Sequence, residues 1–287
     1  MKYSSVAHIL PSAQVQMGNI SIKQPLPTQR VPQISPFLLL HHFGPLQAQP
    51  GEDPLDIGPH PHRGFEPVTF LYSGGIRHKD SRGNEGILAG GDIQWMTAGR
   101  GIIHSERASR EFLENGGVME GIQLWINLPK RYKMEEPRYQ DIKADQLPVL
   151  SESHSLAQTK VVAGTYRGIR GPARTFTPLL ILQIDLAQGG EVEVEIPAGF
   201  NACVYLVRGG AQLNRNFDYP VGTLLYFRND GEGFSLTGLE PTQALVMAGE
   251  PIDEPLAQWG PYVMNEQSEL LEAMRDYQMG KMGFYID

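Results

Sequence analysis

Short apolar runs alternate with glycine-rich turns along most of this chain. Turn signals such as Gly74-Gly75, Gly90-Gly91 and Gly189-Gly190 recur roughly every ten residues. The runs between them are rich in Val, Ile, Leu, Phe and Tyr, which favour strands. Strands are predicted at residues 68–72, 121–128, 179–186, 203–207, 224–227 and 244–247. This rhythm predicts an all-β fold, either a sandwich or a barrel.

One helix is predicted near the C-terminus. Asn265 can cap its first turn and Gly280 can end it. Apolar side chains repeat on one face at Leu270, Leu271, Met274 and Tyr277. We expect this helix to pack on the outside of a sheet, and the pattern predicts no second helix.

The two halves of the chain are related in sequence. Residues 64–75 and 199–210 share five identities in twelve positions, in the same turn–strand–turn order. Such self-similarity indicates a duplicated unit. The charged, proline-punctuated stretch 129–150 is interpreted as the connection between the halves. We therefore expect one domain at residues 1–140 and a second at residues 141–287.

Two short segments carry residues that bind metal ions. One contains His60-Pro-His62 and, four residues on, Glu66; the other contains His104-Ser-Glu106. Positions i and i+2 of a strand face the same side, about 7 Å apart. Two neighbouring strands of this kind would bring three imidazoles and one carboxylate to one ion. The pattern predicts a metal site, with Glu66 as a further acidic candidate.

The second half lacks these ligand types. The fixed offset between the repeats places Glu195 and Pro197 opposite the first histidine pair. A second anchor, Gly91 against Gly222, places Ser235 and Thr237 opposite the His104-Ser-Glu106 segment. We therefore expect one metal per chain, in the N-terminal half.

The remaining histidines have no such partners in sequence. His8, His78 and His154 are interpreted as satisfied or exposed side chains. His41 and His42 end an apolar run, and adjacent strand residues face opposite sides. At most one of these two can therefore face a pocket.

Composition narrows the classes of partner. The formal net charge is −8 and the pI is about 5.5, which argues against direct nucleic-acid binding. The single cysteine, Cys203, cannot form an internal disulfide. No run approaches the roughly 18 apolar residues of a membrane-spanning helix, and the N-terminus has no signal-peptide pattern. We expect a cytoplasmic protein that does not bind membranes.

The motifs resemble those of the pirin family, in the cupin superfamily. The resemblance spans nearly the whole chain and rests on residues 60–66, 96–106, 121–129, 133–134, 137–140 and 260–265. It implies two tandem cupin barrels of jelly-roll type with a C-terminal helix. It also implies a single metal in the N-terminal barrel, held by His60, His62, His104 and Glu106. Glu66 is then left as a supporting or structural residue.

The resemblance further implies a mononuclear divalent metal, usually Fe(II), although Mn, Ni, Cu or Zn could also load because such ligands discriminate poorly. Pirins with quercetinase activity imply an oxidoreductase that cleaves a flavonol-type aromatic substrate, with Glu106 as the catalytic base. Phe65, Trp95 and Trp125 are candidates for lining its pocket. The alternative is an iron-dependent regulatory protein, a transcriptional co-regulator or modulator of a metabolic enzyme, that binds a protein partner without turnover. A cupin isomerase or a metal-storing scaffold is a third reading.

Overall fold

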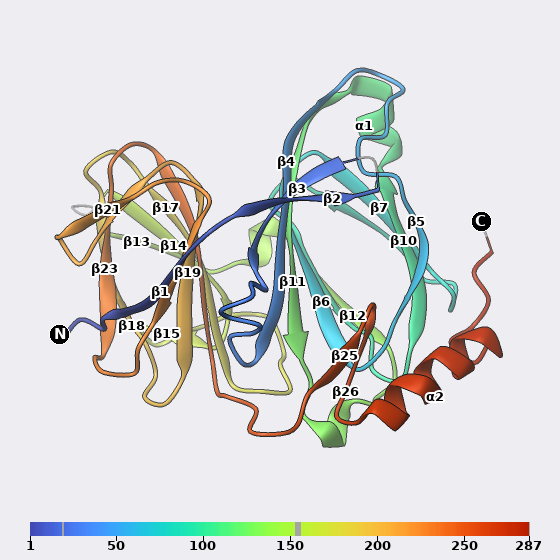
Figure 1. Cartoon of the computed structure of the whole chain (residues 1–287). Coiled ribbons are helices and arrows are strands. Elements are labelled where there is room, and N and C mark those ends of the chain that lie inside the picture. Colours follow the sequence, from blue (N-terminus) through green and yellow to red (C-terminus); the bar gives the residue numbers. More distant parts are fainter. Residues whose placement is uncertain (19, 153–155, 287) are drawn as a thin grey trace. The chain divides into compact units, whose positions relative to one another are not determined.

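The computed structural model describes residues 1–18, 20–152 and 156–286, so that His154 lies outside the described residues. The chain forms two compact units (Figure 1). The first barrel comprises Gln14–Ile22, Phe37–Ala144 and Ile252–Asp287. The second barrel comprises Met1–Ala13, Lys23–Pro36 and Asp145–Pro251. The change of unit between Ala144 and Asp145 falls inside the stretch interpreted as a connection.

The units do not follow a single cut in the sequence. The first residues of the chain belong to the second barrel because strand β1 (Val6–Pro11) pairs antiparallel with β22 (Thr223–Phe227). The last residues belong to the first barrel because helix α2 (Gln267–Gln278) packs on Ile103. The division expected at residue 140 therefore describes the middle of the chain, and both ends cross it.

The first barrel contains a seven-stranded and a four-stranded antiparallel sheet. The larger has the order β12 (Arg138–Ile142), β9 (Ile93–Thr97), β6 (Phe65–Ser73), β11 (Gly117–Asn127), β4 (Phe37–Ala48), β3 (Ile20–Leu26) and β2 (Ala13–Met17). The smaller has the order β5 (Ile57–His62), β10 (Ile102–Ala108), β7 (Gly75–Asp80) and β8 (Glu85–Ala89).

The second barrel repeats this plan. Its larger sheet has the order β1, β22, β19 (Asn201–Arg208), β24 (Thr242–Gly249), β17 (Leu179–Leu186), β14 (Ala157–Ala163) and β13 (Val149–Glu152). Its smaller sheet has the order β18 (Glu191–Glu195), β23 (Gly233–Gly238), β20 (Ala211–Leu213) and β21 (Phe217–Tyr219), and β15 (Thr165–Tyr166) pairs with β16 (Ile169–Arg170). The repeat segments form β6 and β19, which hold the same place in their sheets. The matching strand orders agree with a duplicated unit.

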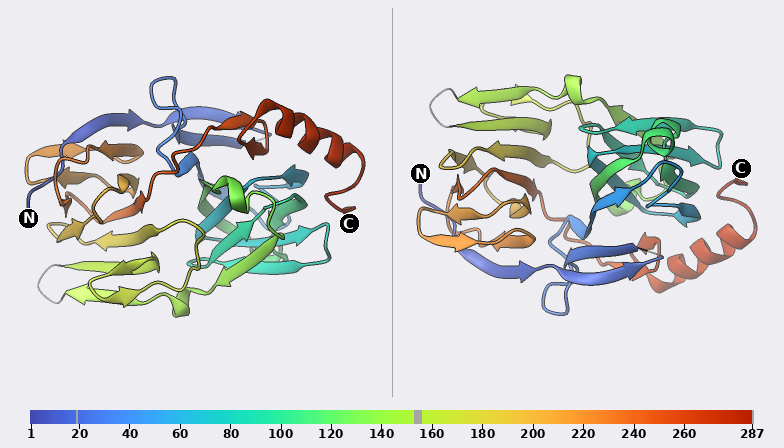
Figure 2. Two further views of the ribbon diagram at one scale, coloured as in Figure 1. Left: turned by 90° about the horizontal axis from the view of Figure 1, so that it is seen from below. Right: turned by 90° about the horizontal axis from the view of Figure 1, so that it is seen from above.

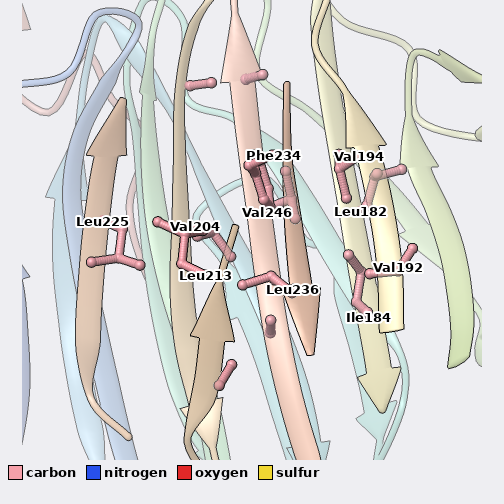
Figure 3. Close-up of a cluster of buried hydrophobic side chains, with 14 of the residues drawn as sticks. Leu182, Ile184, Val192, Val194, Val204, Leu213, Leu225, Phe234, Leu236 and Val246 are labelled. Carbon is pink, nitrogen blue, oxygen red and sulfur yellow. The ribbon is translucent and has the colours of Figure 1, made fainter. Parts of the chain in front are cut away.

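The interior of the second barrel is apolar (Figure 3). Strands β18 and β23 contribute Val192, Val194, Phe234 and Leu236 to this core. Because successive strand residues face opposite sides, Ser235 and its neighbour at position 237 point away from the core. His104 faces the interior of the first barrel, whereas Ser235 faces away from the interior of the second. The sequence alignment that set these two residues opposite each other is therefore shifted by one position.

The C-terminal segment lies along the outside of the first barrel as a hairpin, β25 (Ala257–Trp259) with β26 (Tyr262–Met264), followed by α2 (Figure 2). The predicted helix is confirmed, but its N-cap is Glu266, which forms a capping box with Glu269. Leu270 is buried whereas Leu271 is exposed. The stripe that packs is therefore Leu270, Ala273 and Asp276.

Short helical segments complete the structure. Helix α1 (Arg110–Asn115), which the pattern did not predict, is capped by the side chain of Ser109. Two 3₁₀ turns, η1 (Lys130–Tyr132) and η2 (Ala144–Gln146), lie in the connecting stretch. None of the helices in the described ranges has the length and apolar character needed to cross a bilayer.

Candidate metal centre

Three of the predicted ligands converge on one point in the first barrel. Strands β5 and β10 are antiparallel neighbours (Figure 1). In their register His104 lies directly opposite His60, and Ile102 lies opposite His62. Directly opposed residues share a face, so all three imidazoles lie on the same side of the sheet. Their ligand nitrogens lie within 4.8 Å of one another. The three histidines therefore form a group that can hold a metal ion.

The ring nitrogens are in the form that a metal requires. His60 Nδ1 lies 2.9 Å from the carbonyl oxygen of Gly58, which can only accept, so Nδ1 carries the hydrogen and Nε2 keeps its lone pair. The Nε2 atoms of His62 and His104 are buried and have no hydrogen-bond partner within the described part of the chain. Orphaned polar atoms of this kind need a partner, and a metal ion held with Nε2 of His60 would satisfy both.

Burial also sets the charge of the inner two rings. Removal from water, and then the neighbouring His60, lower the pKa of both His62 and His104 well below the usual value. Both rings are therefore neutral at physiological pH. Neutral imidazole is the form that ligates metals, so these residues fit the group that the sequence predicts.

Glu106 lies two positions beyond His104 on β10 and is held by the opposite sheet. Its carboxylate accepts hydrogen bonds from Thr69 Oγ1 at 3.3 Å and from Gln123 Nε2 at 3.1 Å. Trp125 Nε1 donates to Gln123 Oε1 at 3.0 Å, which turns the amide nitrogen toward Glu106. Burial raises the pKa of Glu106, while His60, Gln123 and Thr69 oppose that rise.

Glu66 faces the other way. It alternates with Thr69 across β6, so the two side chains lie on opposite faces of the larger sheet. Its Oε1 accepts a hydrogen bond from Thr97 Oγ1 at 2.6 Å, and burial raises its pKa to about 7. The neighbouring cation Arg63 contacts Asp276 at 3.0 Å. The structure thus gives Glu66 a packing role on the side of the sheet away from Glu106.

The turn that follows β5 is held in place by a residue that is not a predicted ligand, Lys133. Lys133 is 1% exposed, and its Nζ donates to Gly64 O at 2.9 Å, Val263 O at 2.9 Å and Asn127 Oδ1 at 2.7 Å. Gly64 follows His62 by two residues. This buried ammonium therefore joins the ligand turn to β11 and to the C-terminal hairpin.

Two of the three aromatic candidates lie beside the site. Trp125 and Phe65 have ring centroids 5.4 Å and 5.1 Å from that of His62, and 4.2 Å from each other. Trp95 pairs with Val68 on the face of the sheet that Glu66 shares. It is fully buried there, which makes it a core residue.

Sequence reasoning missed one residue beside the site. His78 was interpreted as a satisfied or exposed side chain, yet it is buried and its Nε2 lies 3.1 Å from His104 Nδ1. This contact depends on strand pairing that spacing along the chain does not reveal. The expectation that at most one of His41 and His42 faces the interior agrees with the register: His41 lies opposite Gln123, whereas His42 faces the other side and pairs with Glu120 at 3.0 Å.

The chain is similar to known proteins over most of its length. The family described as Pirin matches residues 19–126, and the Pirin C-terminal cupin domain matches residues 181–283. A Pseudomonas aeruginosa protein provisionally named a quercetin 2,3-dioxygenase is 38% identical over 86% of each chain. Arabidopsis thaliana pirin-like protein 2 is 38% identical over 88% of this chain and 76% of its own length. The crystal structure of an Acinetobacter baumannii quercetin 2,3-dioxygenase superposes with a TM-score of 0.93 at 36% identity, covering 99% of this chain and 100% of that one.

The fold and the cluster of histidines first define a class: a bicupin protein with a candidate metal centre in one of its two barrels. The extent and identity of the matches then define the family. This chain belongs to the pirin family.

Proposed function

We propose that this chain is a metal-dependent dioxygenase of the quercetin 2,3-dioxygenase type, acting on a flavonol-like substrate. The observation that carries this proposal is the meeting of three imidazoles, whose ligand nitrogens lie within 4.8 Å of one another, in the barrel that also holds the buried carboxylate of Glu106. The names of the Pseudomonas and Acinetobacter relatives support the substrate class.

His60, His62 and His104 would hold the metal, with Glu106 as the fourth ligand. Fe(II) is the metal we propose, and Mn, Ni, Cu or Zn suit the same donors. A metal held there would supply Lewis-acid chemistry toward the substrate and dioxygen.

Glu106 would accept the hydroxyl proton of the flavonol. As a metal ligand its carboxylate would be held deprotonated, so its strength as a base would depend on loosening that contact. Gln123 and Thr69 hold both oxygens on the interior side, so the carboxylate is aimed before the substrate arrives. Phe65 and Trp125 offer flat apolar surface beside His62 for an aromatic ring.

The test is turnover by the metal-loaded protein. Purified chain is loaded with Fe(II), Mn(II) or Ni(II), quercetin is added under oxygen, and the loss of flavonol absorbance is followed. We expect turnover that is abolished in His62→Ala and reduced at least a hundredfold in Glu106→Gln. His8→Ala serves as the control because His8 is exposed in the second barrel. Metal binding without turnover on a panel of flavonols would reject the enzyme and favour the regulatory alternative.

A further inference from the structure

His78 lies directly behind one of the metal-ligand histidines. It sits on β7, the neighbour of β10, where its cross-strand partner is Glu106. The side chain is 2% exposed, and its ring centroid lies 5.2 Å from that of His104 at an interplanar angle of 49°. The nearest polar atoms are His78 Nε2 and His104 Nδ1, 3.1 Å apart. A hydrogen bond joins the two rings, and its direction depends on which nitrogen carries the hydrogen.

Metal ligation fixes that direction. A neutral imidazole has one N–H and one lone pair. If Nε2 of His104 binds the metal, the hydrogen of that ring must be on Nδ1, and it points at His78 Nε2. His78 must then accept. If His78 instead donated, the hydrogen of His104 would move to Nε2 and its lone pair would no longer face the metal.

We propose that His78 is a positioning residue of the metal centre. By accepting a hydrogen bond at Nε2, it holds His104 in the tautomer and ring orientation that present Nε2 to the metal. Partners of this kind are general for metal-bound histidines, and their loss lowers metal affinity by about 10- to 100-fold. The inference deepens the proposed function, on whose metal site it rests.

The surroundings of His78 suit an acceptor. The ring is buried, so water does not compete for its nitrogen Nε2. Tyr139, from β12 of the opposite sheet, packs on it with ring centroids 4.6 Å apart, and its hydroxyl lies 3.0 Å from the same Nε2. In the proposed tautomer His78 Nε2 has a lone pair and no hydrogen, so the Tyr139 hydroxyl can only donate to it and shares that lone pair with His104 Nδ1–H.

The experiment measures metal affinity without substrate. Co(II) is titrated into the full-length protein against a competing chelator, with the Co(II) d–d absorption as a second readout of ligand geometry. His78→Gln keeps an acceptor at the reach of Nε2, His78→Asn is too short to reach His104, and His78→Leu has no acceptor. Tyr139→Phe is the matched control, because it keeps the packed ring and loses only the hydroxyl.

We expect affinities within about threefold of the parent for His78→Gln and Tyr139→Phe, and 10- to 100-fold weaker binding for His78→Leu and His78→Asn. Equal affinity in His78→Leu, or a loss in His78→Gln as large as in His78→Leu, would overturn the inference. If His78→Leu does not fold, as judged by thermal unfolding of the metal-free protein, the Asn and Gln pair decides. Metal binding by the parent chain without quercetin turnover would reject the enzyme while leaving this inference in place, and no metal binding at all would reject both.

Discussion

Replacement of Lys133 by methionine tests how the ligand turn is held. Methionine keeps the unbranched apolar stem and removes only the ammonium. Three buried oxygens, those of Gly64, Val263 and Asn127, then lose their donor. An unsatisfied buried acceptor costs about 1–3 kcal/mol. At the lower end of that range, Lys133→Met should destabilise the protein by about 3 kcal/mol. The lower end applies because burying a charge has its own cost, which is evident in a Lys133 pKa lowered to about 7.

The assay is urea unfolding followed by circular dichroism, with Lys130→Met as the matched control. Lys130 is 56% exposed in its side chain and reaches Glu266 at 3.3 Å. A surface contact of this kind contributes about 0–1 kcal/mol. The reasoning fails if the Lys133 and Lys130 variants unfold at the same urea concentration. A second measurement, Co(II) affinity, should fall for Lys133→Met alone, because only that change releases the turn after His62.

Three further substitutions test the packing of the ligand turn and the burial of Glu66. Gly64 has φ +86°, and an added Cβ would overlap the carbonyl oxygen of Val263. Gly64→Ala should therefore lower metal affinity at least tenfold. Gly83 has φ +84° with open space around it, so Gly83→Ala should cost only a backbone strain of about 1–2 kcal/mol in urea unfolding and leave metal affinity unchanged. Equal losses of metal affinity in the Gly64 and Gly83 variants would contradict the proposed clash with Val263. The Glu66 carboxyl has a folded pKa of about 7 against an ordinary 4.5, so the folded state holds the extra proton between these values and stability falls as pH rises through them. Glu66→Gln should accordingly gain stability relative to the parent between pH 5 and 8, by at most about 3 kcal/mol, and a pH-independent difference in urea midpoints would refute the assignment.

Much of the fold can be predicted from the sequence because each strand is a short apolar run between glycine-rich turns. All six predicted strands are confirmed; β17 coincides with residues 179–186, β11 begins four residues before the predicted run 121–128 and ends one residue short of it, and the other four extend their predicted runs. The C-terminal helix was found from its apolar spacing. Helix α1 was missed because six residues are too few for a periodicity to show.

The metal centre can be predicted from the sequence only where its ligands recur at positions i and i+2 of one strand. His60 with His62 can be assigned to one face from spacing alone. What brings His104 opposite His60, or His78 behind His104, is the pairing of β10 with β5 and β7. Register is set by which faces are buried and by the turns. A reader of the sequence cannot tell an ordinary histidine from a supporting one until that register is known.

The two barrels share one strand order but differ in the residues that their strands turn inward. In the second, β18 and β23 turn valine, phenylalanine and leucine inward, and burial of this apolar surface stabilises the unit. In the first, β5 and β10 turn histidine and glutamate inward, and the facing strands supply Thr69 and Gln123. Polar groups contribute little net stability when buried, and leaving them unpaired is expensive. In addition to its apolar clusters, the first barrel uses directed contacts, such as those of the Lys133 ammonium and the Arg63–Asp276 pair, to hold side chains in place. The hairpin and helix at the C-terminal end of the chain supply a partner to each of these contacts, the carbonyl of Val263 and the carboxylate of Asp276.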